Sequence, residues 1–432
     1  MTVEAHSAAP QESPASRENH PSAPDFWAQH MRSVIGPLMQ AIDTYSPADQ
    51  EANLRFLDEH IAPTLGPLPT DPHPTYVAPC AVVGTPFNPS FNVSSTGTPK
   101  VRFDYDLLPP LDRARSADPW GEAAARALLL RLAAVVGADT QWLEHFLSRL
   151  FLTPAETEAL RPKIPPQLVL PAAMVGFEFN AGRRPRMKAW VPSMRRAIVE
   201  GRSSNEIALE ALRGLTPLGA DIAPAVDVLA GWIAESPHDL RLILAGMDCS
   251  APRDSRIKMY LVTVKNSWET VRDVMTLGGR LADAASRKRV ALLRAIWPYL
   301  MNESEGDRLA DATWCKPERM PGVGFYGLMY SVEIKPGRPL PETKLYVPLF
   351  QYAESSAVAE KNMETVLTLL DTDWGRSGRY RRAMEATFGK GKEYGQVFAA
   401  YAYSESTGGY INSYVSRPIE NSPVHPIEVE YV

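Results

Sequence analysis

The chain has 432 residues, of which 45% are hydrophobic and 22% are charged, and its formal net charge is −5 at pH 7. This is the composition of a folded protein, and the negative charge argues against a general nucleic-acid binder or membrane-surface binder. No run approaches the roughly 18 apolar residues that a membrane span needs. Any attraction for an anion must therefore be local.

The first 25 residues are rich in Ala, Ser, Pro and Glu and lack the apolar segment of a signal peptide. They predict a disordered leader over 1–25, followed by a single domain over 26–432. Cys80, Cys249 and Cys315 show no CxxC spacing, which fits a reducing compartment and gives no disulfide framework or zinc site. We therefore expect a cytoplasmic protein.

In chain order, two segments with helical periodicity precede two extended segments that a turn-rich STGTP separates, which predicts a helix pair followed by a hairpin. Four further units follow the same pattern. We expect helices at 26–45, 47–65, 119–136, 140–151, 193–214, 223–235, 267–282, 284–302, 355–371 and 376–388. We expect strands at 76–94, 99–108, 167–180, 184–193, 240–249, 255–264, 324–334, 343–350, 396–406 and 409–417.

Ten antiparallel strands would leave two long exposed edges in an open sheet, and closure into a barrel removes these edges. Side chains alternate across a strand. One side of the second strand in each of the first four hairpins is apolar: Val101/Phe103/Tyr105, Met187/Ala189/Val191, Ile257/Met259/Leu261 and Leu345/Val347. The opposite sides carry polar residues and would line a lumen. An open sheet with one solvated face is the alternative.

A cation is followed two positions later by a large aromatic residue in three separate hairpins, as Lys188/Trp190, Lys258/Tyr260 and Lys344/Tyr346. A solvated face has no need for that pairing, although cross-strand aromatic residues do occur on open sheets. The pattern therefore favours the lumen without excluding the open sheet.

Five cations fall on the polar sides: Arg102, Lys188, Arg256, Lys258 and Lys344. In one lumen each close pair would repel by roughly several kcal/mol at an effective dielectric constant of about 20, so they imply a bound polyanion. A diphosphate fits, because it accepts many charge-assisted hydrogen bonds.

Four aromatic residues, Trp190, Tyr260, Tyr346 and Tyr414, could surround a positively charged organic fragment by cation–π attraction. Diphosphate and carbocation together describe one reaction, in which an allylic diphosphate ionises and an electron-rich ring attacks the allyl cation.

The chain resembles the dimethylallyltryptophan synthase family of fungal aromatic prenyltransferases over residues 26–430. The resemblance rests on VRF at 101–103, MKAW at 187–190, RIKMY at 256–260, KLYVPLFQY at 344–352 and GYINSY at 409–414. It implies an α+β fold, a ten-stranded antiparallel prenyltransferase barrel of αββα repeats inside a ring of helices. It also implies transfer of a prenyl group, dimethylallyl here, to an aromatic acceptor in secondary metabolism, with no metal or other cofactor. The chain has no DDxxD motif and no HxH or HxxxH pair.

By this resemblance, the donor diphosphate ligands fall on Arg102, Lys188, Arg256, Lys258 and Lys344. The carbocation shield falls on Trp190, Tyr260, Tyr346, Tyr410 and Tyr414, where Trp190 replaces the family's tyrosine. Met329 matches a position that limits donor length, and a bulky thioether there favours the five-carbon donor. As a structural alternative, Met329 is a core-facing side chain.

Residues expected at the acceptor site are Cys80, Ala81, Asn88, Met174 and Arg241. Asn88 stands in PFNPSFN where members acting on indoles usually carry a glutamate, and Met174 stands where tryptophan C4-prenylating members use a lysine. An amide accepts a hydrogen bond but is no base near neutral pH. We expect Asn88 and Lys188 to take part in catalysis, and Asn88 favours a phenolic or polyketide acceptor.

Three alternatives stay open on the acceptor and on the type of protein. An indole acceptor, such as tryptophan, an indole alkaloid or a tryptophan-containing cyclic dipeptide, is compatible if Glu178 or a tyrosine replaces the missing base. Arg241 could instead bind an acceptor carboxylate, or be solvated. A non-enzymatic scaffold with a basic face for an anionic partner would consume no allylic diphosphate. We expect small-molecule partners, no nucleic acid and no membrane, and a homodimer is left open.

Overall fold

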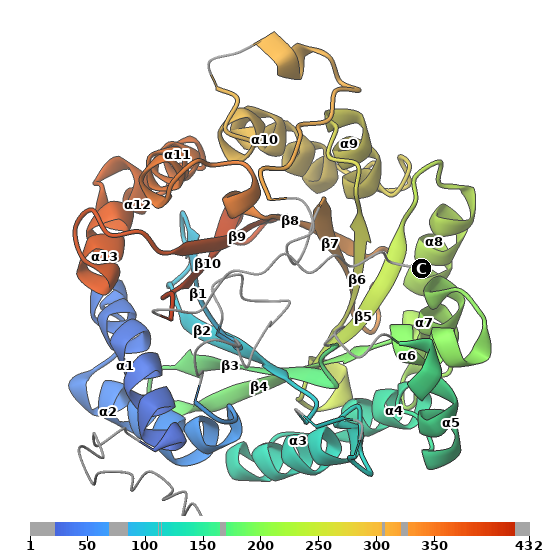
Figure 1. Cartoon of the computed structure of the whole chain (residues 1–432). Coiled ribbons are helices and arrows are strands. Elements are labelled where there is room, and N and C mark those ends of the chain that lie inside the picture. Colours follow the sequence, from blue (N-terminus) through green and yellow to red (C-terminus); the bar gives the residue numbers. More distant parts are fainter. Residues whose placement is uncertain are drawn as a thin grey trace, which may run out of the picture.

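Ten antiparallel strands close into a barrel in the computed structural model, which describes residues 22–68, 85–110, 112–113, 115–164, 170–304, 307–320 and 327–419 (Figure 1). Around the barrel the strand order is β1-β10-β9-β8-β7-β6-β5-β4-β3-β2. The strands are β1 (Phe87–Ser94), β2 (Val101–Leu107), β3 (Ala173–Asn180), β4 (Arg183–Pro192), β5 (Arg241–Asp248), β6 (Ile257–Thr263), β7 (Leu328–Ile334), β8 (Glu342–Val347), β9 (Gly395–Ser404) and β10 (Gly408–Ser416). The predicted barrel is confirmed, and the open-sheet alternative is wrong.

Helices form a ring outside the barrel (Figure 1). They are α1 (Ala23–Ile42), α2 (Pro47–Phe56), α3 (Glu122–Val136), α4 (Gln141–Leu150), α5 (Pro154–Leu160), α6 (Met194–Glu200), α7 (Ser204–Arg213), α8 (Gly219–Glu235), α9 (Trp268–Thr276), α10 (Ala284–Leu300), α11 (Ser356–Leu369), α12 (Asp373–Arg376) and α13 (Arg379–Phe388). Within the described ranges, no helix is both long enough and apolar enough to cross a membrane.

Local capping explains where the helices differ from the expectation. α1 begins three residues earlier than expected because the Ser22 side chain accepts a hydrogen bond from the backbone N–H of Asp25. The helix expected over 193–214 is two helices, since Gly201 adopts the left-handed conformation with φ 64° and ends α6. α5, which was not expected, starts with a capping box between Thr153 and Glu156.

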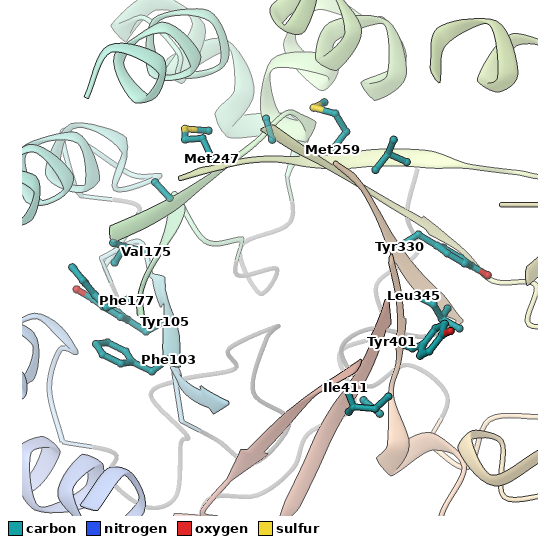
Figure 2. Close-up of a cluster of buried hydrophobic side chains, with 14 of the residues drawn as sticks. Phe103, Tyr105, Val175, Phe177, Met247, Met259, Tyr330, Leu345, Tyr401 and Ile411 are labelled. Atoms are coloured by element: carbon teal, nitrogen blue, oxygen red, sulfur yellow. The ribbon is translucent and has the colours of Figure 1, made fainter. Parts of the chain in front are cut away.

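The apolar sides of the strands face the helices and form the main core. Figure 2 shows this outward set, including Phe103, Met247, Met259, Leu345 and Ile411, pointing away from the barrel interior. These side chains are at most 3% exposed. Full burial of each stabilises the fold by about 1.5–3 kcal/mol. Because successive residues alternate, the residues between them point into the lumen.

Candidate active site

The register between neighbouring hairpins repeats one arrangement of inward side chains. Where β4 pairs with β5, Lys188 lies opposite Asp248 and Trp190 lies opposite Gly246. Where β6 pairs with β7, Lys258 lies opposite Glu333 and Tyr260 lies opposite Ser331. Each cation thus faces an acid, and each aromatic residue faces a small one. The lumen therefore has a layer of charges beside a layer of aromatic rings.

The layer of charges is held by three carboxylates. Glu178 contacts Arg102 (Nε at 2.8 Å) and Lys188 (Nζ at 3.8 Å). Asp248 contacts Lys188 at 3.4 Å and Arg256 at 2.8 Å. Glu333 contacts Arg256 at 3.0 Å and Lys258 at 3.6 Å. The structure thus brings four of the five predicted cations into one continuous ion-pair chain.

These carboxylates correct the expectation of five mutually repelling charges. Burial raises the pKa of Asp248, but Lys188 and Arg256 outweigh it and hold that pKa at about 2. The cations beside Glu178 and Glu333 likewise hold the pKa of each acid below its ordinary value against burial. The three carboxylates offset part of the charge of the five cations, so the local attraction for an anion is smaller than the sequence suggested.

Lys344, the fifth cation, forms no ion pair with any described residue. The side-chain oxygen of Asn412, in the orientation that satisfies both neighbours, accepts hydrogen bonds from Lys344 Nζ at 2.8 Å and Arg102 Nη1 at 3.2 Å. Nζ also lies 5.0 Å from the ring centroid of Tyr410 and 5.5 Å from that of Tyr346. Burial, followed by the charge of Lys258, lowers the pKa of Lys344 well below its ordinary value.

A pocket opens where the two layers meet. It is lined by Lys188, Trp190, Gly246, Met247, Asp248, Arg256 and Lys258. Burial and the neighbouring Arg256 guanidinium lower the pKa of Lys258 to about 7. An anion that binds beside Lys258 would raise this pKa again, so that the amine takes up a proton.

The aromatic layer is a second apolar cluster, separate from the main core. The ring centroid of Tyr346 lies 5.8 Å from that of Tyr260, 6.2 Å from that of Tyr414 and 6.4 Å from that of Phe398. Trp190 and Met329 pack in the same cluster. Burial raises the pKa of Tyr260, Tyr346 and Tyr414, so these rings stay neutral and present π faces.

Trp190 fits the lumen because glycines flank it. A Cβ on Gly176 of β3 would lie 3.0 Å from Cζ3 of Trp190, and Gly246 of β5 lies directly opposite the indole. A larger side chain at either position would collide with the ring. Both neighbouring strands thus provide the space that the indole of Trp190 occupies.

Asn88 lies opposite Asp104 in the β1–β2 pairing, and its Nδ2 donates a hydrogen bond of 3.1 Å to Oδ1 of Asp104. Met174, expected near the acceptor, pairs with both Asp106 of β2 and Trp190 of β4 and is 8% exposed. The predicted Asn88 and Met174 therefore lie on adjoining parts of the lumen wall.

Arg241 is more peripheral than Asn88 and Met174. Arg241 lies at the start of β5, where its partly exposed side chain pairs with Asp239 at 3.3 Å. Cys80 and Ala81 lie outside the described residues. In the described ranges, no group of three or more His, Cys, Asp or Glu side chains is arranged to hold a metal ion.

Comparison with known proteins identifies the family. The model of the tryptophan dimethylallyltransferase family matches residues 23–383. The chain belongs to this family, and the protein is a prenyltransferase. The indole prenyltransferase tdiB of Emericella nidulans is 48% identical over 406 residues, covering 92% of this chain and 96% of that protein.

Two further comparisons extend this result. The O-glucose prenyltransferase PaPT of Phomopsis amygdali is 31% identical and covers 94% of this chain and 92% of its own length. The crystal structure of AnaPT from Neosartorya fischeri matches with a TM-score of 0.76 at 20% identity, over 92% of this chain and 96% of that one. This likeness confirms the barrel fold of the family.

Sequence reasoning missed the acids of the lumen. Glu178 was considered only as a substitute base, and Asp248 and Glu333 were not considered. A signal was present, because a small residue precedes an acid by two positions in the first strand of three hairpins, as Gly176/Glu178, Gly246/Asp248 and Ser331/Glu333. Phe398 was also missed, because the inward and outward sides of β9 were not distinguished in the sequence.

Proposed function

We propose that the protein transfers a dimethylallyl group from dimethylallyl diphosphate to an aromatic acceptor, without a metal ion. The observation that carries the proposal is the contact between the two lumen layers, in which the pocket touches Lys188, Arg256 and Lys258 on one side and Trp190 on the other. The leaving group and the allyl cation need these two environments next to each other.

In the proposed reaction the diphosphate binds to Arg102, Lys188, Arg256, Lys258 and Lys344. The C–O bond of the donor breaks, and the cations stabilise the charge that develops on the diphosphate. The rings of Trp190, Tyr260, Tyr346, Tyr410 and Tyr414 shield the allyl cation from water, each contributing on the order of 1–2 kcal/mol. The acceptor ring attacks the cation and then loses a proton.

An indole is the first candidate for the acceptor. Its support is the 48% identity to a relative named an indole prenyltransferase, over nearly the whole of both chains. The case for a phenol rested on the lack of a carboxylate at Asn88, and Asp104 lies 3.1 Å from that amide.

A phenolic acceptor is the second candidate. Oδ1 of Asn88 is buried and accepts no hydrogen bond from a described residue. It could therefore accept the hydroxyl hydrogen of a phenol.

Incubation of the purified full chain with dimethylallyl diphosphate and EDTA tests the proposal. The acceptors are L-tryptophan, a tryptophan-containing cyclic dipeptide, a bisindole and a phenolic polyketide. We expect a prenylated indole. No product from any acceptor overturns the enzymatic proposal, and product from the phenol alone overturns the indole preference. Lys258→Ala is expected to keep the fold and to weaken donor binding.

A further inference from the structure

Asp104 interrupts the repeated arrangement of the lumen. Two positions after the cation, the other hairpins carry Trp190, Tyr260 and Tyr346, whereas Asp104 follows Arg102 in β2. Its partner across the β2–β3 pairing is Gly176, as the partner of Trp190 is Gly246. A carboxylate therefore takes the place of an aromatic ring in the layer that would surround the reacting carbon atoms.

Asp104 has no cationic partner among the residues that the structure describes. It is 8% exposed and forms no ion pair with any described residue, unlike Glu178, Asp248 and Glu333. Its Cβ and Cζ3 of Trp190 both lie 3.0 Å from the position of a Cβ on Gly176, so Asp104 and Trp190 are neighbours. Asp104 therefore does not neutralise a cation, as Glu178, Asp248 and Glu333 do, and an ion pair does not explain its burial.

Asn88 orients this carboxylate and offers a second acceptor. Its Nδ2 donates to Oδ1 of Asp104 at 3.1 Å, which leaves Oδ1 of Asn88 buried with no hydrogen bond from the described part of the chain. A buried acceptor without a donor is costly unless a ligand supplies one. The pair thus presents one carboxylate and one amide oxygen for a ligand that brings N–H or O–H groups.

We propose that Asp104 takes the proton which the acceptor ring loses after prenylation, and that the amide oxygen of Asn88 binds the N–H of the acceptor. This inference rests on the proposed function. The ring carbon forms a bond to the allyl cation, its C–H bond breaks, and the electron pair returns to the ring. The proton passes to the Asp104 carboxylate and later to water. Asp104 would supply the base that Asn88 cannot.

The charge state of Asp104 fits this role near neutral pH. Burial and the charge of Asp106 raise the pKa of Asp104 to about 7, although the Asn88 hydrogen bond lowers it. The phenols of Tyr346 and Tyr414 are also close enough to interact with this charge. The carboxyl is protonated below pH 7 and cannot take a proton, so turnover should rise as the pH increases through 7.

The test compares Asp104→Asn with Asp106→Asn, a matched control on the same face of β2 one pair farther from Asn88. Turnover is measured from pH 5.5 to 9 with dimethylallyl diphosphate and the best indole of the panel, and inorganic pyrophosphate binding is measured by calorimetry. We expect Asp104→Asn to lower kcat on the order of 10²-fold or more, to lose the rise near pH 7 and to keep pyrophosphate affinity. Asp106→Asn should keep the plateau rate and move the rise to lower pH.

Two results would overturn the inference while leaving the proposed function intact. One is wild-type turnover and pH dependence in Asp104→Asn. The other is a wild-type turnover that shows no rise between pH 6 and 8, which decides the matter even if Asp104→Asn does not fold. If the wild-type protein neither forms product nor binds pyrophosphate, the proposed function itself fails.

Discussion

The indole of Trp190 lies against the backbone of Gly246 on the neighbouring strand. A Cβ on Gly246 would lie 2.5 Å from Cδ1 and 2.6 Å from Nε1 of Trp190, and 3.0 Å from Cε2 of Tyr260. Heavy atoms do not approach this closely without displacement. The glycine therefore sets the position of two rings in the aromatic layer.

Gly246→Ala should displace Trp190 and lower kcat by about 10-fold or more, since small misplacements at a reacting centre are costly. In a Trp190→Ala background the same exchange should have a much smaller effect, because only the 3.0 Å approach to Tyr260 remains. Gly231→Ala, a helical glycine with open space around its Cα, is the matched control and should leave turnover unchanged. Equal losses from Gly246→Ala in both backgrounds would contradict this account.

Pyrophosphate binding should draw a proton to Lys258 above pH 7. Burial and Arg256 lower the pKa of Lys258 to about 7, so at pH 8 the free protein holds it mostly neutral, and the bound anion restores its charge. The affinity of the wild-type protein should therefore fall more steeply from pH 7 to 9 than that of Lys258→Met. Calorimetry in two buffers of different ionisation enthalpy counts the protons. Equal uptake in both proteins would show that Lys258 is already charged.

Met329→Ala should widen donor choice. Met329 lies opposite Tyr346 and Val262 and packs in the aromatic layer, so its removal leaves space where a longer prenyl chain would extend. We expect the turnover of geranyl diphosphate relative to dimethylallyl diphosphate to rise about 10-fold or more, the scale on which pocket contacts discriminate. The control is Met259→Ala, an outward-facing methionine of β6, which should cost stability of about 2–5 kcal/mol without changing the ratio. If the ratio of geranyl to dimethylallyl turnover were unchanged in Met329→Ala, Met329 would not limit the length of the donor.

Asp104→Asn should also change how stability depends on pH. The pKa of Asp104 is about 7 in the folded protein and 3.8 ordinarily, so between these values the folded state holds a proton that the unfolded state has lost. The stability contributed by this group therefore falls as the pH rises from about 4 to 7. Between pH 5 and 8 the wild-type protein should lose on the order of 2 kcal/mol relative to Asp104→Asn. Parallel Tm curves for the two proteins would argue against a raised pKa.

The barrel could be predicted because its strands alternate strictly. Residues such as Phe103 and Met259 share one side, and the period of two depends only on backbone geometry. The cations were found for the same reason. The register between hairpins could not be derived from the sequence, because it is set by tertiary packing over long separations. The pairing of Lys188 with Asp248 could not be predicted, because it depends on this register.

The acceptor end was harder to predict for a related reason. The residue type at position 88 alone shows that no carboxylate is present there. The acid–base chemistry of the site also depends on the side chain opposite Asn88 on β2, which the sequence does not reveal. The alternation of β2 places Asp104 on the inward side, but its approach to Asn88 at 3.1 Å appears only in the fold.

Glu178, Asp248 and Glu333 also bear on how quickly the enzyme can begin a new cycle. A cage of cations alone would retain the diphosphate after the prenyl group has left, and product departure would limit turnover. In the proposed reaction, each carboxylate would re-form its contact with a lysine or arginine, at 2.8–3.8 Å, as the diphosphate leaves. The same acids that reduce the affinity for the donor diphosphate would then speed the release of the product diphosphate.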